Sequence, residues 1–338
     1  MLTPSMCILA LALESHPDFP LILLFNRDER FDRETEPVAP HEDGCVHATD
    51  VEAGGTWMSI NSHTGALAAL TNVRCAGPTG RPLESRGVLV RRAVLGEAWV
   101  ALHSNAYACF NMLWGTLRAD GASELRLSAC APSSEGDFAV STTELRVERG
   151  RAAVLTKTND ASGQMTGPAS AAGSDAAWPK AAWLQQEVAR RLEGARPKCA
   201  GRAGAEEVLR LLMPAMSTSA LAGAAAEAAE AARGVHSHHA AWSERRLQAA
   251  PFITPFDNHA GPEPAAEGSH APGYAPSWYG TVSQTAWLLS KSEACVWVAY
   301  RETARPRGDM THGAGGTEPA AVGEHGPWRW QRVPLPRT

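Results

Sequence analysis

The chain has 338 residues, of which 44% are hydrophobic and 20% are charged, a composition typical of a globular protein with a sizeable core. The net charge is −5 and there is no basic block, so nucleic acid and anionic membrane surfaces are not expected partners. No apolar run is long enough to span a bilayer, and no Lys or Arg precedes Arg27 as a secretory signal would require. We therefore expect a cytoplasmic protein without a transmembrane segment.

The seven cysteines are scattered along the chain and form no CxxC pair. This pattern suits a reducing compartment and argues against a disulfide framework or a zinc site, so no metal site is predicted. Three histidines, His236, His238 and His239, lie close together, but within a low-complexity segment. We interpret that cluster as incidental.

The first elements predicted along the chain are two strands that form a hairpin. Met6–Leu13 and Leu21–Phe25 are apolar runs, and Glu14–Pro20 between them has turn chemistry. The second strand ends in the polar cluster Asn26–Arg30. Charges at the end of a buried strand must pair with each other or face a cleft, and the plainer interpretation is a strand that runs out into solvent.

Two later strands are also followed by polar residues. Leu67–Leu70 precedes Asn72, and Ala153–Thr156 precedes Asn159. Turn or capping roles explain isolated asparagines at such places slightly better than catalytic roles do. Three predicted strands thus end in polar residues.

The remaining pattern predicts strands, then helices, then strands. Helices are expected within Ser85–Val100, Pro179–Leu192 and Glu206–Leu212, and strands at Phe110–Leu117, Leu125–Cys130, Leu145–Val147, Trp278–Leu289, Cys295–Tyr300 and Trp328–Val333. This order favours an α+β fold with largely antiparallel sheets. We expect one domain over residues 1–338, with a low-complexity insertion at 217–240, an irregular loop at 258–276 and a loop at 304–326.

Several short motifs occur in the order found in one known family. These are Met6-Cys7 before an apolar strand, NRDE at 26–29, AGGTW at 53–57, LTNVR at 70–74, SRGVLV at 85–90, WPK at 178–180 and YGTVSQT at 279–285. Each motif is weak alone, but their order and spacing resemble the NRDE family, also called the transport and Golgi organisation protein 2 family. The resemblance covers residues 6–302.

That family is similar to the N-terminal-nucleophile hydrolases, and the resemblance implies their four-layer αββα sandwich. It also implies site residues: Cys7 would be the nucleophile, Arg27 and Asp28 the supporting strand-end pair, and Asn72 and Asn159 the groups that bind an oxyanion or orient a substrate. The alternative for Cys7 is a small buried strand residue, and the alternative for Arg27 and Asp28 is a structural ion pair.

The sequence departs from the family pattern in two places. Cys7 is not the second residue, so an N-terminal cysteine requires translation to start at Met6 or a leader to be trimmed. Val282 stands where the family usually has arginine, which weakens any catalytic or anion-binding role at that position.

Two functions follow from the resemblance. The first is an intracellular trafficking or homeostasis protein that binds a hydrophobic small molecule, haem or an acyl-lipid, in the cleft of the sandwich and supports Golgi organisation and secretion. No cofactor is then required, haem being cargo, and association with the Golgi or mitochondria is expected. The alternative is an N-terminal-cysteine amidohydrolase or thioesterase that uses Cys7. The sequence does not identify the ligand or any protein partner.

Overall fold

The computed structural model describes residues 7–73, 84–97, 106–121, 123–132, 138–146, 150–160, 164–167, 179–194, 199–219, 251–253, 256–257, 278–304 and 325–336. In this part of the chain the protein is an α+β sandwich of two antiparallel sheets, as expected. The predicted insertion and the two predicted loops lie almost entirely outside the described residues.

The first sheet has seven described strands. They are β1 (Ile8–Leu13), β2 (Leu21–Arg30), β10 (Ala153–Lys157), β11 (Phe256–Asp257), β12 (Trp278–Ser290), β13 (Cys295–Glu302) and β14 (Arg329–Pro334). Their order is β10-β1-β2-β12-β13-β14, and β11 pairs with β12. β2 is therefore paired along both edges, by β1 and by β12.

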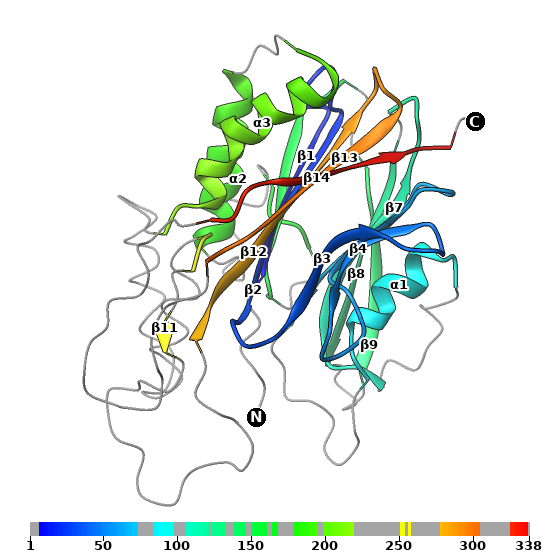
Figure 1. The fold of residues 1–338 in the computed structure, drawn as a ribbon, viewed down its shortest axis with the longest axis vertical. Helices are drawn as coiled ribbons and strands as arrows, with labels where there is room; N and C mark the ends of the chain where they lie inside the picture. Colours follow the sequence, from blue (N-terminus) through cyan, green and yellow to red (C-terminus); the bar gives the residue numbers. More distant parts are fainter. Residues whose placement is uncertain are drawn as a thin grey trace, which may run out of the picture.

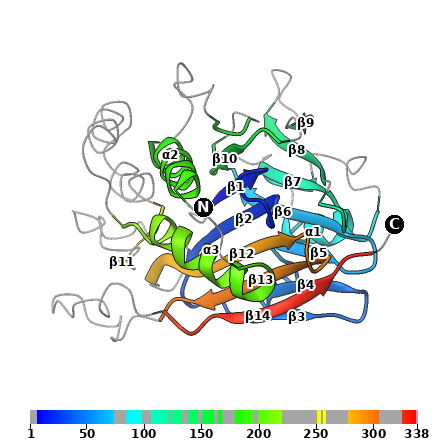
Figure 2. The same ribbon diagram turned by 90° about the horizontal axis from the view of Figure 1, so that it is seen from above.

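The second sheet also has seven described strands and follows the chain in order, from β3 to β9. They are β3 (Thr35–Pro40), β4 (Cys45–Asp50), β5 (Met58–Asn61), β6 (Ala66–Asn72), β7 (Phe110–Leu117), β8 (Ser123–Pro132) and β9 (Phe138–Leu145). The two sheets stack face to face, and β14 of the first sheet contacts β3 of the second (Figure 2).

Three helices cover the outer faces of the sandwich in the described chain. α2 (Pro179–Glu193) and α3 (Gly201–Met216) pack on the first sheet, while α1 (Gly87–Val94) packs on the second (Figure 1). Separate apolar clusters lie under α2 and α3 and under α1, and a third fills the space between the sheets. The layers are therefore helix, sheet, sheet, helix. None of the helices described is long and apolar enough to cross a membrane.

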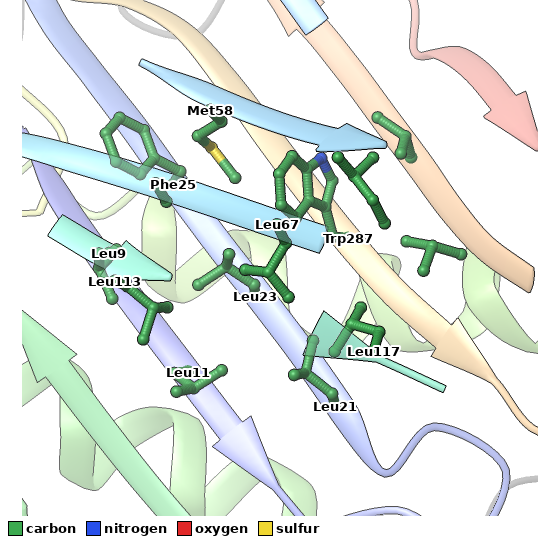
Figure 3. Close-up of a cluster of buried hydrophobic side chains, with 14 of the residues drawn as sticks. Leu9, Leu11, Leu21, Leu23, Phe25, Met58, Leu67, Leu113, Leu117 and Trp287 are labelled. Carbon is green, nitrogen blue, oxygen red and sulfur yellow. The ribbon is translucent and has the colours of Figure 1, made fainter. Parts of the chain in front are cut away.

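Alternation along the strands explains why both faces of the first sheet are apolar. Leu9 and Leu11 of β1 and Leu23 of β2 point into the core between the sheets, whereas Ile8 and Ile22 face the helices. Figure 3 shows this inter-sheet core, in which leucines of both sheets surround Trp287. Each fully buried side chain of this size contributes about 1.5–3 kcal/mol to folding.

Local patterns missed some elements. β2 continues through the charged cluster to Arg30, because β12 pairs with it along its whole length. β3 and β4 were not predicted, since Pro37, Pro40 and the polar residues between them obscure the strand pattern. α3 extends well beyond its predicted core of Glu206–Leu212, and it contains Pro214.

One cysteine departs from the expectation of reduced thiols. Cys109 is disulfide-bonded, and its partner lies outside the described residues. The free cysteines described are Cys7, Cys45, Cys130, Cys199 and Cys295. No CxxC motif contains Cys109, so spacing along the sequence did not predict this crosslink.

Candidate functional site

The polar end of β2 is buried although it carries three charges. Asn26, Arg27, Asp28 and Glu29 are each at most 5% exposed. The interpretation of a strand running into solvent is therefore wrong. Because successive residues of a strand face opposite sides, the four side chains divide between the inter-sheet core and the helix layer.

Arg27 points to the second sheet. Its Nη2 donates a hydrogen bond to Asp50 Oδ2 at 3.2 Å, and its guanidinium lies 4.5 Å from the centre of the Trp57 ring. Both partners come from sequence near or within the AGGTW motif. Arg27 therefore pairs with Asp50 and not with its neighbour Asp28.

Asp28 lies on the opposite side and faces the positive charge of Lys180 at the start of α2. Its Oδ1 accepts a hydrogen bond of 2.7 Å from Thr281 Oγ1, and Tyr279 donates to its backbone carbonyl. Burial raises the pKa of Asp28 to about 7, and Lys180 and Thr281 act in the opposite direction by favouring the carboxylate. Burial in turn lowers the pKa of Lys180, against the attraction of Asp28.

Cys7 is buried immediately before β1, on the core side of the first sheet. The next residue, Ile8, pairs with Asn26, so Cys7 lies beside the Asn26–Arg27 step of β2. Two cations interact with it electrostatically: Lys180 and Arg86. Burial lowers the pKa of Arg86 to about 10, and this side chain also donates to Cys109 O.

The two predicted asparagines meet each other. Asn159 Nδ2 donates a short hydrogen bond to Asn72 O, which joins the end of β10 to the end of β6. Asn111 Nδ2 holds the same turn by donating to the carbonyls of Thr158 and Asp160, at 3.2 and 2.9 Å. The residues after β10 are thus fixed to the second sheet.

Val282, the departure from the family pattern, lies at a β-bulge. The pairing of β12 with β2 shifts between Thr281 and Ser283, so Val282 has no partner residue on β2. Its carbonyl accepts a hydrogen bond from the Thr303 amide. An arginine at this position would start from the bulge next to Asp28.

A second feature is an open groove of about 720 Å³ on the helix side of the first sheet. Its lining comes from α3, from the end of β13, from the segment leading into β14 and from β14 itself, and includes Leu209, Met213, Trp328 and Trp330. One cavity between the sheets, beside Trp57, is much smaller, at about 10 Å³.

The groove also carries positive charge. Arg202 is paired with Glu206 at 2.9 Å and lies 4.0 Å from the centre of the Trp330 ring. Arg301 lies 4.5 Å from the Trp328 ring centre, and it makes no ion pair with the residues described. Burial, with a smaller effect of Arg301, lowers the pKa of His325 to about 4, so this histidine is neutral near pH 7.

The motifs belong to a recognised family. A family model described as Transport and Golgi organisation 2 matches residues 6–302, which is most of the chain. The chain belongs to the Transport and Golgi organisation 2 family. No curated protein matches it.

Most of the motifs that this chain shares with the Transport and Golgi organisation 2 family meet around one end of β2. Two charged members of those motifs, Arg86 of SRGVLV and Lys180 of WPK, were missed as site residues. The sequence feature that could have indicated them is a basic residue at the beginning of a predicted helix. They gain importance only when α1 and α2 pack against the sheets and bring their charges near Cys7.

A thiol close to two cations can act as a nucleophile, since nearby positive charge favours the thiolate. Asp28, with its raised pKa, is a group that could exchange a proton near pH 7. Within the described chain, no three His, Cys, Asp or Glu side chains converge as metal ligands would. The clustered histidines at 236, 238 and 239 lie outside the described residues.

Proposed function

We propose that this member of the Transport and Golgi organisation 2 family binds a hydrophobic small molecule, haem or an acyl-lipid, in the groove beside α3. Through that ligand it would act in intracellular trafficking and support Golgi organisation and secretion. The observation that carries the proposal is the groove itself, which has the size of a small-molecule site and is walled by Trp328, Trp330, Leu209 and Met213.

The sequence-based expectation was a ligand in the cleft of the sandwich, without a location on either sheet. Leucines and aromatic side chains fill the inter-sheet layer, and the small space beside Trp57 could not hold such a ligand. The groove lies outside that layer and is open. We propose a cytoplasmic protein that associates with the Golgi or with mitochondria, and in which haem would be cargo and not a resident cofactor.

Titration with haem and with palmitoyl-CoA tests the proposal. Saturable quenching of tryptophan fluorescence is expected with at least one of them. Trp328→Leu should weaken binding, whereas Trp183→Leu on α2 removes a tryptophan that does not line the groove and serves as the control. No saturable binding of either compound would contradict the proposal.

A second candidate function is hydrolysis of an amide or thioester by Cys7. The placement of this thiol near the charges of Lys180 and Arg86 favours it. The Cys7 thiolate would attack the carbonyl carbon of the substrate, and the amine or thiol of the substrate would leave with a proton. Water would then hydrolyse the resulting thioester between the acyl group and Cys7. If residues 1–6 were removed, the α-amine of Cys7 would be the base.

Intact mass and N-terminal sequencing of the protein from its native cell decide whether Cys7 becomes the first residue. Turnover of acyl substrates by wild type and Cys7→Ala then tests catalysis, with Cys130→Ala as a matched change at another buried thiol. Equal rates in wild type and Cys7→Ala would remove this candidate.

A further inference from the structure

The groove contains Arg301, a cation that no carboxylate of the described residues balances. Arg301 contacts Gln284, Ser217 and Trp328, all uncharged, and it pairs with no acidic side chain in the described segments. Burial lowers the pKa of Arg301 to about 10, so the side chain remains charged near neutral pH. Arginine prefers planar oxyanions because its guanidinium can donate two parallel hydrogen bonds.

The other polar groups of the groove fit the same kind of ligand. Arg210 is exposed and forms no ion pair within the described chain. Glu206, the one acidic residue among the described lining, is already paired with Arg202. His325 Nδ1 is buried and has no hydrogen-bond partner among the residues described. Positive charge, a free imidazole nitrogen and tryptophan faces are therefore combined in one groove.

Two side-chain amides in sequence, those of Gln284 and Asn26, hold the Arg301 guanidinium in place. Its Nε donates to Gln284 Oε1 at 2.9 Å, and Gln284 Nε2 donates to Asn26 Oδ1 at 3.0 Å. Asn26 is itself fixed, since its Nδ2 donates to the carbonyls of Met216 and Pro251, each at 2.8 Å. The first residue of the NRDE motif is thereby connected to the groove.

We propose that the groove binds an amphiphile that carries a carboxylate or phosphate group, that Arg301 binds this oxyanion, and that Asn26 and Gln284 position Arg301. The apolar part of the ligand lies against Trp328 and Trp330. The inference rests on the proposed small-molecule function and specifies its ligand class. It also assigns Asn26 a role that is separate from Cys7 and the two cations near it, Lys180 and Arg86.

Two probes separate the anionic group from the apolar chain: dodecyl phosphate and dodecanol, both below their aggregation limits, followed by tryptophan fluorescence. Wild type should prefer the phosphate by about tenfold, as expected for a charge-assisted hydrogen bond. Arg301→Gln should abolish the preference and leave dodecanol binding unchanged. Arg329→Gln removes a neighbouring exposed arginine that does not line the groove, and it should change neither affinity.

Gln284→Met tests positioning, because it retains Arg301 and removes its acceptor. The preference for phosphate should fall several-fold while dodecanol still binds, a result that general loosening of the fold would not produce. Gln284→Glu is the second variant: its carboxylate would pair with Arg301 and should abolish the preference. Arg301→Lys, which keeps the charge and loses the fork, should restore part of the preference lost in Arg301→Gln.

The contrary outcomes are distinct. If both probes bind wild type and Arg301→Gln retains the preference, the inference fails and the proposed function stands. If neither probe and neither haem nor palmitoyl-CoA binds wild type, both fail. Binding to vesicles that contain phosphatidic acid without binding of monomeric dodecyl phosphate would indicate a membrane surface and would also overturn the inference.

Discussion

Arg27 Nη2 and Asp50 Oδ2 lie 3.2 Å apart, and this ion pair joins β2 of one sheet to β4 of the other. The two side chains are 5% and 12% exposed, so little water screens them. Arg33 Nε also donates to Asp50 Oδ2, at 2.7 Å. One carboxylate therefore holds two arginines at the edge of the inter-sheet core.

Asp50→Asn should destabilise the protein by about 3 kcal/mol, because Arg27 loses this carboxylate partner and Arg33 keeps only its longer pair with Glu29, at 3.7 Å. Arg27→Met should cost less, since Arg33 still pairs with Asp50. Chemical denaturation measures both values, and the double variant Arg27→Met/Asp50→Asn gives the coupling energy. A loss below about 1 kcal/mol in Asp50→Asn would show that the pair is not structural.

A second prediction concerns the contact between the AGGTW segment and α1. A Cβ atom added at Gly87 would lie 2.8 Å from Thr56 N, and one added at Gly55 would lie 2.8 Å from Gly87 C. Because the atoms in contact belong to the backbone, Gly87→Ala should destabilise the protein by about 1–3 kcal/mol. It should also move the neighbouring Arg86 away from Cys7. Gly194→Ala, where the nearest atom is 3.9 Å away, should be neutral in the same thermal unfolding assay.

The sequence was sufficient for elements whose signal is local. The hairpin of β1 and β2, the strands β7, β12 and β13 and the start of α2 follow from apolar runs, turn residues and a proline at the first helical turn. The extension of β2 to Arg30 could not be predicted in this way. Its charges are stabilised by β12 and by Asp50, which are distant in sequence.

The candidate site was also predictable only where its signal is local in the sequence. Polar residues at the ends of strands indicated Asp28, Asn72 and Asn159, but the assignment of partners needed the packing of helices on sheets. Lys180 was visible only as a motif residue, and the groove was not predicted at all. Its walls come from α3 and from the region around the start of β14. No periodic sequence pattern relates these two parts of the chain.

His47 should make stability depend on pH in the acidic range. It is buried, stacks on His41 at 3.9 Å and donates from Nδ1 to Ala48 O. Burial, followed by the charge of His41, lowers its pKa to about 4, and Arg91 acts in the same direction. The unfolded chain has the ordinary higher pKa, so it binds a proton between about pH 6.5 and 4 that the folded protein does not bind.

The free energy of unfolding should therefore fall as the pH decreases through this window, by about 2–3 kcal/mol from His47 alone. His47→Gln should lose that part of the pH dependence, whereas His63→Gln, at an exposed position, should retain it. Denaturant titrations at about pH 4, 5, 6 and 7 provide the comparison, because these steps cover the interval between the folded-state and unfolded-state pKa of His47. Parallel curves for wild type and His47→Gln would contradict the assignment.

Lys180 and Asp28 lead to a prediction of opposite sign. Burial raises the pKa of Asp28 to about 7, and Lys180 limits the rise by favouring the carboxylate. In Lys180→Met the pKa of Asp28 should rise further, because the cation is gone. A folded-state pKa above the unfolded value means that the folded protein retains a proton which the unfolded chain releases, so stability decreases as the pH increases from about 4 through the folded-state pKa.

Lys180→Met should thus lose more stability relative to wild type at about pH 8 than at about pH 5. The double variant Asp28→Asn/Lys180→Met carries no titrating group at either position, and its stability relative to wild type should not show this decline. Thermal unfolding at the two pH values measures the difference. If Lys180→Met and wild type respond to pH alike, the two buried side chains do not interact as a charged pair, and Lys180 does not influence the pKa of Asp28.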